Sequence, residues 1–187
     1  MATDSRQRIE LAACDLLSRH GYHGLGLKAL SRESELPYGS IYHHFPGGKE
    51  EIAAAAIEAC GDLVAGMIRS RTPDASRFGR DLFSFMARRL SGSGWADGCP
   101  VGTPALDGAA DSELVREACA RAFAAMTEAV AGLLVALELP ADRAADLATT
   151  IVAAYEGAAM LARVQRSDAP LRTVGEAMAG LVRQALP

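Results

Sequence analysis

The segment "ELPYGSIYHHFPGGKEE", residues 35–51, predicts a short helix enclosed by helix-breaking residues. Pro37 stands where the first turn of a helix tolerates proline, and Pro46, followed by Gly47 and Gly48, ends the helix. Three uses of this segment are open: the histidines bind a metal, the "FPGGK" turn binds phosphate, or the short helix is inserted into a partner.

The two faces of this helix differ in character. Ile41 and Phe45 are four residues apart, so they share a face that we expect to be buried against Leu27 and Leu30. A purely structural helix of this length seldom exposes two aromatic rings and two imidazoles. Small residues on this exposed face let the backbone approach a duplex, and its rings can hydrogen-bond phosphates or base edges. It comprises Tyr38, Gly39, Ser40, Tyr42, His43 and His44.

Two further helices are predicted before this one. Residues 4–24 place apolar side chains at three- and four-residue spacing and reach a stop at Gly21. Residues 27–36, "LKALSRESEL", form a second, short helix. A helix, a brief loop and another short helix are the geometry of a helix-turn-helix, whose second helix enters the major groove of DNA.

These residues carry a family resemblance. The stretch "GYHGLGLKALSRESELPYGSIYHHFPGGKEEI", residues 21–52, resembles the DNA-binding domain of the TetR family of transcriptional regulators. Gly39, Tyr42, His44 and Phe45 match its glycine and aromatic core, and Lys49 matches the lysine that opens the fourth helix. The "FPGGKEE" turn and the "GCPVG" segment further resemble a subgroup of drug- and small-molecule-responsive repressors.

The resemblance implies a homodimeric repressor that leaves a near-palindromic double-stranded DNA operator when it binds a small, largely apolar effector. It also implies that the last two long helices form the dimer interface, where small residues permit close packing; packing within one chain is the alternative. The residues expected to contact DNA are Gly26, Lys28, Pro37, Tyr38, Gly39, Ser40, Tyr42, His43, His44 and Lys49.

Three positions depart from the family pattern. Gly26 stands where Ser or Thr usually opens the second helix, so only its backbone is offered to a phosphate. Glu35 replaces the glycine that is common in the turn, which brings a negative charge near DNA. Tyr38 replaces a frequent lysine. These changes are expected to alter affinity or the sequence read.

Composition bounds the remaining possibilities. The chain has 187 residues, of which 50% are apolar and 22% charged, so it can bury a substantial core in one or two domains. No uninterrupted apolar run reaches the length of a membrane span, and the polar N-terminus is unlike a signal peptide, so a cytoplasmic protein is expected. The net charge of −4 argues neither for nor against DNA, because phosphates respond to the local patch.

Beyond Lys49 the pattern stays helical, with alanine-rich amphipathic stretches ending at prolines and glycines. The fold class predicted is all-α, with about nine helices. Residues 1–48 form the expected DNA-binding domain, and residues 49–187 the ligand-binding and dimerisation domain. Candidate pocket residues, several of them aromatic or methionine, are Phe83, Met86, Trp95, Cys99, Phe123, Met126, Tyr155 and Glu156. Trp95 is expected to report on a pocket mouth.

Metal binding, nucleotide binding and cysteine chemistry are less well supported by the sequence. The pairs His43/His44 and His20/His23 lack further ligands, so no metal and no cofactor is expected. The "PGGK" turn lacks the spacing of a nucleotide-binding loop. Four scattered cysteines predict reduced thiols packed as small apolar residues. The rival functions are an all-α small-molecule-binding protein that no longer reads DNA and, more remotely, an enzyme that uses Cys99 or Glu156.

Overall fold

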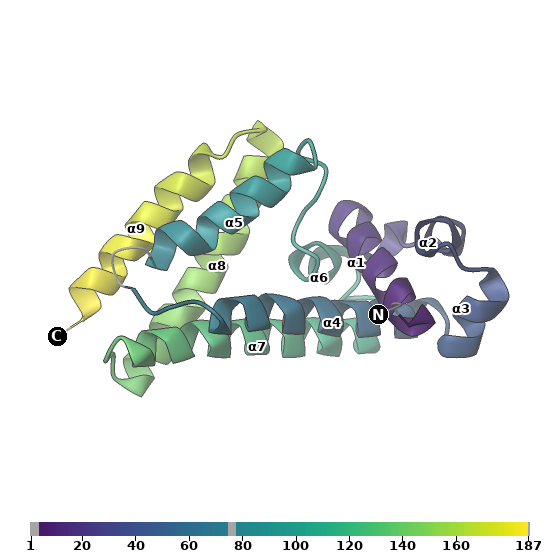
Figure 1. The fold of residues 1–187 in the computed structure, drawn as a ribbon, viewed down its shortest axis with the longest axis horizontal. Coiled ribbons are helices and arrows are strands. Elements are labelled where there is room, and N and C mark those ends of the chain that lie inside the picture. Colours follow the sequence, from purple (N-terminus) through teal and green to yellow (C-terminus); the bar gives the residue numbers. More distant parts are fainter. Residues whose placement is uncertain (1–3, 75–77, 187) are drawn as a thin grey trace. The chain divides into compact units, whose positions relative to one another are not determined.

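The computed structural model describes residues 4–74 and 78–186, and within these residues the chain is helical with no strands (Figure 1). This confirms the predicted all-α fold of about nine helices. The helices are α1 Ser5–Gly24, α2 Leu27–Ser34, α3 Tyr38–His44, α4 Lys49–Arg69, α5 Phe78–Gly92, α6 Gly102–Asp107, α7 Glu113–Ala136, α8 Ala141–Gln165 and α9 Ala169–Ala185.

The chain packs into two compact units, and each is built from two separate stretches of sequence. The first unit contains residues 1–63 and 99–123, and the second contains residues 64–98 and 124–187. The boundary at residues 63/64 falls inside α4 and the one at residues 123/124 falls inside α7, so each of these helices contributes to both units. These packing units differ from the division at residue 48 that the sequence suggests, which is a division by function.

The first unit is organised around α1, which packs against α2, α3 and α6. Its apolar stripe is buried as the spacing predicted, with Ile9 and Leu17 fully inaccessible to solvent. The helix kinks at Gly21, whose φ of 69° lies in the left-handed region that favours glycine. A Cβ at this position would collide with the carboxylate of Asp107. Glycine is therefore required both by the backbone angle and by the approach of α6.

The second unit is a layer of helices in which α9 packs along α5 and also contacts α8 (Figure 1). Helices α5 and α9 approach so closely that a Cβ on Gly79 would collide with the backbone at Gly175 and Ala179. The small residues of α9 that the sequence assigned to a dimer interface therefore pack within the chain at Gly175 and Ala179. Packing within one chain, the alternative to the dimer interface, thus accounts for these two positions.

By length and composition alone, α7 and α8 are each long and apolar enough to cross a membrane. Buried side chains nevertheless recur along each helix at three- and four-residue spacing, as in Ala144, Ala148, Ile151 and Tyr155 of α8. The exposed side of α8 carries charged residues, such as Asp142, Arg143 and Asp146, together with apolar ones such as Val164. This one-sided pattern is typical of helices that cover a protein core.

Candidate DNA-binding surface and ligand pocket

Helix α3 has the boundaries and the faces that its sequence predicted. Pro37 precedes its first turn, and its carbonyl accepts hydrogen bonds from the backbone N–H groups of Ser40 and Ile41. Ile41 and Phe45 are completely buried, which confirms the predicted core face. On the other side, Tyr38 and Tyr42 remain 46% and 48% exposed. Large rings left this open on a two-turn helix are available to a partner.

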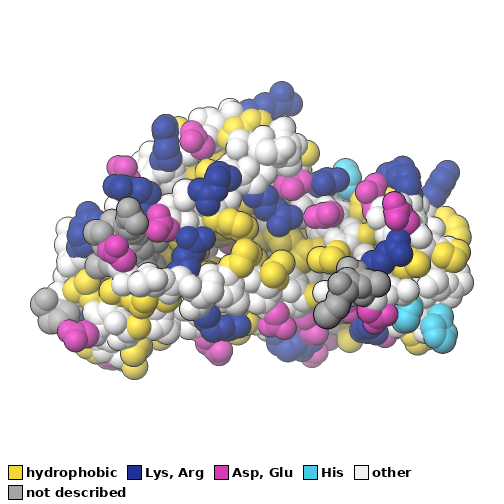
Figure 2. Space-filling model, viewed as in Figure 1, with side chains coloured by type: hydrophobic (Ala, Val, Ile, Leu, Met, Phe, Trp, Pro, Cys, Tyr) yellow, Lys and Arg dark blue, Asp and Glu magenta, His cyan; other side chains and the backbone are white. Residues whose placement is uncertain are grey.

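The remaining predicted DNA contacts lie around these tyrosines or at the start of α2. Histidine side chains lie at the surface near the end of α3 (Figure 2). The rings of His43 and His44 are edge-to-face, with their centroids 5.2 Å apart. Gly26 precedes α2 without a side-chain cap, as its sequence implied. Gly26, Lys28, Pro37, Gly39 and His43 are exposed, whereas Ser40, His44 and Lys49 are half-buried.

The turn between α2 and α3 is fixed by contacts from α1. Glu35 ends α2 in a left-handed conformation, with φ of 53°. The Arg8 guanidinium donates a hydrogen bond to the Ser34 carbonyl at 2.7 Å and lies 3.2 Å from the Glu35 carboxylate. The charge of Glu35, which the sequence suggested would oppose DNA, is thus paired with an arginine of the same unit.

Two cations contact helix ends in this unit, Arg6 at the end of α3 and Lys49 at the end of α1. The Arg6 guanidinium lies 4.4 Å from the centroid of the Phe45 ring and donates to the His44 carbonyl at 3.2 Å. A cation at this point complements the C-terminal end of the α3 dipole. Lys49 opens α4 as predicted, and its Nζ donates to the His23 carbonyl at 3.2 Å while lying over the Tyr22 ring. Lys49 therefore also holds the end of α1.

An acidic residue from α6 anchors the junction between α1 and α2. The two carboxylate oxygens of Asp107 accept hydrogen bonds from the backbone N–H groups of Tyr22, at 2.9 Å, and His23, at 3.0 Å. Nearby, the His23 imidazole lies 3.0 Å from the carboxylate of Asp111. Sequence reasoning missed Asp107, because its partners lie more than 80 residues away. The glycine kink at Gly21 was the one local signal.

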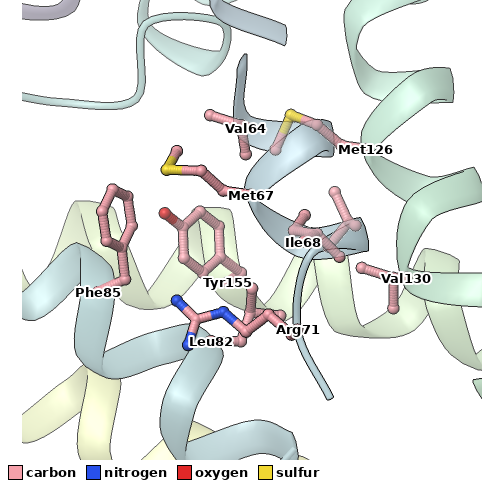
Figure 3. A pocket seen from close by; sticks show the side chains of 10 residues that line it. Val64, Met67, Ile68, Arg71, Leu82, Phe85, Met126, Val130 and Tyr155 are labelled. Atoms are coloured by element: carbon pink, nitrogen blue, oxygen red, sulfur yellow. The ribbon is translucent and has the colours of Figure 1, made fainter. Parts of the chain in front are cut away.

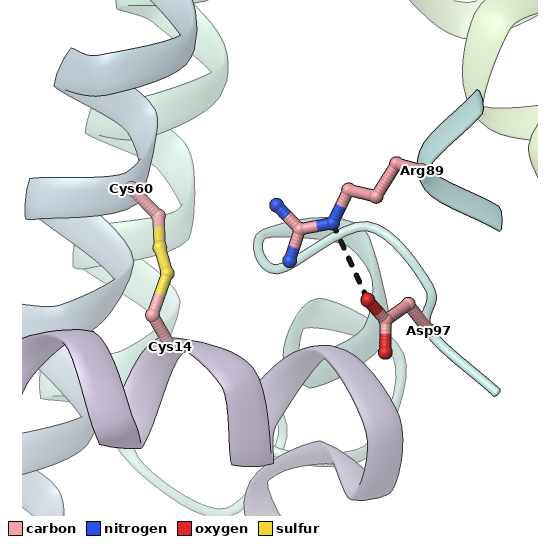
Figure 4. The surroundings of a disulfide bond; sticks show 4 residues. All are labelled: Cys14, Cys60, Arg89 and Asp97. Carbon is pink, nitrogen blue, oxygen red and sulfur yellow. Dashed lines mark ion pairs between the residues drawn. A yellow bond between two sulfur atoms is a disulfide. The ribbon is translucent and has the colours of Figure 1, made fainter. Parts of the chain in front are cut away.

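A disulfide joins Cys14 of α1 to Cys60 of α4 within the first unit (Figure 4). Their Cα atoms are 6.5 Å apart, within the range that a disulfide spans. The expectation of four reduced thiols is therefore wrong for this pair. Cys99 and Cys119 are buried and not disulfide-bonded. Burial raises the pKa of the Cys119 thiol to about 11, so it is protonated and unreactive near neutral pH.

An apolar pocket lies inside the second unit, where α4, α5, α7 and α8 converge (Figure 3). Tyr155 stands in it with its ring edge-to-face against Phe83, at a centroid separation of 5.5 Å. Among the described residues of the lining, Arg71, just beyond α4, is the only charged one. The other residues that line the pocket are Val64, Met67, Ile68, Leu82, Phe85, Met126, Val130 and Val152.

The predicted pocket residues are divided among different places. Met126 and Tyr155 line the apolar pocket. Phe83 and Trp95 line a separate groove beside α5, so Trp95 is not part of the apolar pocket's lining. Met86, Cys99, Phe123 and Glu156 line neither cavity. The α4 residues of the lining were missed, because their apolar spacing looks like that of any buried helix face.

Comparison with known proteins agrees with this architecture. Residues 10–56 match the family described as bacterial regulatory proteins of the tetR family. Residues 78–177 match the C-terminal domain described as transcriptional regulator LmrA/YxaF-like. The chain belongs to the TetR family. It is therefore a helix-turn-helix transcriptional regulator.

Curated relatives of this TetR-family chain align over nearly its whole length. An uncharacterised HTH-type transcriptional regulator, YxaF of Bacillus subtilis, is 32% identical, and the alignment covers 97% of this chain and 96% of YxaF. The HTH-type transcriptional regulator LmrA of the same organism is 29% identical, with 97% and 98% covered.

Solved structures share the fold at lower identity. A regulatory protein TetR from Rhodobacter sphaeroides superposes with a TM-score of 0.80 at 23% identity, over 94% of this chain and 97% of that one. A TetR regulator from Legionella pneumophila gives 0.77 at 21% identity, over 100% and 99% of the two chains.

Proposed function

We propose that this regulator is a cytoplasmic homodimeric repressor that releases a near-palindromic operator when a small, largely apolar effector enters the apolar pocket. One observation carries the proposal. Helix α4 is continuous from Lys49, which holds the end of α1, to Val64, Met67 and Ile68, which line the pocket. A shift of this helix changes the pocket and the support of the helix-turn-helix together.

The present size of the pocket supports a coupled mechanism. Its free space is about 30 Å³, which is room for one or two waters, whereas drug-sized ligands occupy pockets of roughly 300–1,000 Å³. An effector must therefore widen the pocket and favours a different arrangement of its lining helices. A coupling of about 1–3 kcal/mol between the two sites would weaken operator binding roughly 5- to 150-fold.

Dimerisation is supported by apolar side chains left open on the last two helices. Met160, Leu161 and Val164 of α8 are 56%, 53% and 84% exposed, and Leu181 of α9 is 42% exposed. A second copy would cover them, and a dimer that reads a near-palindrome needs its two copies of α3 about 34 Å apart, one turn of the duplex. The exposed residues of α3 and the start of α2 would then contact each half-site.

The operator test uses fluorescence anisotropy with labelled DNA that flanks the protein's own coding region. We expect salt-dependent, saturable binding of a dimer to a near-palindrome. Tyr42→Ala should weaken this binding about tenfold, since one base or phosphate contact is worth about 1–3 kcal/mol. A chain that binds apolar compounds but none of this DNA would instead be a small-molecule-binding protein that no longer reads DNA.

The effector test compares two phenylalanine substitutions. Val152→Phe fills the apolar pocket, whereas Val135→Phe adds the same ring at an exposed position of α7 outside its lining. Because its ring must widen the pocket as an effector would, Val152→Phe should weaken operator binding without any ligand and no longer respond to apolar compounds, while Val135→Phe keeps both operator binding and release. Calorimetric titration with and without operator should give the same coupling factor in either direction. A coupling factor of 1, or release that survives Val152→Phe, would contradict the mechanism.

A further inference from the structure

A second cavity in the second unit has a chemistry unlike that of the apolar pocket. It is a groove of about 540 Å³ bounded by α5, the turn after α8 and the start of α9. We call it the arginine groove, after the residues that line it: Arg80, Arg88, Arg166 and Arg172. Its volume lies within the range that small-molecule sites occupy.

Positive charge predominates in this groove, although the chain as a whole is acidic. Four arginines face two carboxylates, Asp168 and Glu176, and one of these carboxylates is already engaged. Arg172 Nε lies 3.7 Å from Asp168 Oδ1, and Arg88 donates to the hydroxyl of Ser84. In the described part of the chain, Arg80, Arg88 and Arg166 form no ion pair. Figure 2 shows Lys and Arg side chains gathered over α5 and α9.

An aromatic ring stands among these cations. Trp95, the single tryptophan of the chain, lines the groove and is only partly buried. The segment that carries it is held to α5, because Arg89 Nε lies 3.6 Å from the buried carboxylate of Asp97. Phe83 and Leu171, both buried, supply apolar lining. The groove thus joins a surface suited to a flat ring to a set of charge-assisted donors.

Two residues of the groove have costly backbone conformations. Trp95 has φ of 68° and Arg166 has φ of 49°, in the left-handed region that non-glycine residues seldom occupy. At Arg166 this conformation caps the end of α8, where the Ser167 N–H donates to the Ala162 carbonyl at 3.1 Å. The two side chains that would supply the ring contact and a cation are therefore positioned where glycine would be more stable.

We propose that the arginine groove binds a small organic polyanion that joins several negative charges to a flat ring, as a nucleoside polyphosphate does. Guanidinium groups recognise phosphate oxygens in pairs, and each of the unpaired arginines can do so. The indole of Trp95 packs against the ring. This site is separate from the apolar pocket, and the proposal does not depend on operator release.

The test follows Trp95 fluorescence in purified protein without Mg²⁺. The probes are adenosine triphosphate, inorganic tripolyphosphate for charge alone, and adenosine for the ring alone. We expect saturable binding of adenosine triphosphate at least tenfold tighter than that of either fragment, weakening as salt rises. Absence of saturable binding, or equal affinity for triphosphate and tripolyphosphate, would overturn the proposal.

Matched variants locate the site. The double variant Arg80→Gln/Arg88→Gln should bind adenosine triphosphate at least tenfold more weakly, while Arg143→Gln, an exposed arginine of α8 outside the groove, leaves affinity unchanged. Melting curves check that each variant is folded. Trp95→Ala, measured by calorimetry, should abolish the advantage of adenosine triphosphate over tripolyphosphate. If the double variant binds as tightly as the parent, the arginine groove is not the site.

Discussion

The two units of this regulator are stabilised in different ways. In the first unit, polar contacts tie together residues far apart in sequence, as when Asp107 accepts hydrogen bonds from the backbone of Tyr22 and His23. A disulfide between α1 and α4 adds a covalent tie. In the second unit, apolar side chains and the close approach of Gly79 and Gly175 hold the helices around two cavities. The contrast suits a unit that must present α3 in one position and a unit that must yield to a ligand.

The largest effect should come from the core of the first unit. Phe45→Ala removes a completely buried ring and is expected to lower the free energy of unfolding by about 3–5 kcal/mol. Urea unfolding followed by circular dichroism measures this change. Tyr42→Ala on the exposed face of α3 is the control and should leave the unfolding midpoint nearly unchanged. Equal losses for both variants would show that the two faces of α3 do not differ as described.

A second test measures how much the disulfide contributes to the stability of the first unit. Because Cys14 and Cys60 enclose a long loop, the oxidised protein should be more stable than the reduced one by about 2–4 kcal/mol. Thermal melts with and without a phosphine reductant measure the difference. Cys60→Ser should melt at the same temperature in both conditions. If the melting temperature of the parent protein is also unchanged by reductant, the disulfide contributes nothing to stability.

The second unit should be most sensitive where α5 and α9 meet. Gly79→Ala places a methyl group against the backbone of α9, so overpacking is expected to cost about 1–3 kcal/mol. Gly180→Ala is the matched control, since its new Cβ would meet only the end of the Arg183 side chain, at 3.9 Å. Alanine favours a helix, so this control should be neutral or slightly stabilising. A stable Gly79→Ala would imply that α5 and α9 separate easily.

The anchor at Asp107 can be weakened without changing its shape. Asp107→Asn keeps one acceptor oxygen but loses the second acceptor and the charge, and we expect a loss of about 1–2 kcal/mol in unfolding free energy. Operator binding should weaken as well, since the anchored segment leads into α2, whereas effector affinity should change little. Asp62→Asn, an exposed carboxylate of the same unit, controls for the lost charge. Full operator affinity in Asp107→Asn would remove this residue from the positioning of the helix-turn-helix.

The helix-turn-helix was predictable because its signals are local. Four-residue spacing identified Ile41 and Phe45 as buried, and the proline and glycine boundaries set the length of α3. The sequence also placed Lys49 at the start of α4, but not its contact with His23, 26 residues away. The disulfide partner of Cys14 has no local signature at all.

The pocket was harder to predict for a related physical reason. A buried methionine or valine has the same helical spacing whether it faces another side chain or a cavity, so Met67 and Val152 look like ordinary core residues in the sequence. Trp95 was assigned to a pocket mouth from its irregular segment, and it does line a cavity, but the one that is rich in arginine. Only the packing of distant helices separates the two cavities.

The smallest expected effect tests how well the first unit excludes water around Cys119. Burial raises the pKa of this thiol from 9.0 to about 11 in the folded chain, so between these values the folded state holds a proton that the unfolded state has lost. Stability must then fall as pH rises, by about 1 kcal/mol between pH 8 and pH 10. Cys119→Ala removes this contribution but leaves that of Tyr22, whose pKa burial also raises. As pH increases, the free energy of unfolding should therefore fall more steeply for the parent than for Cys119→Ala. Parallel curves for the two proteins would mean that water reaches the Cys119 thiol in the folded state.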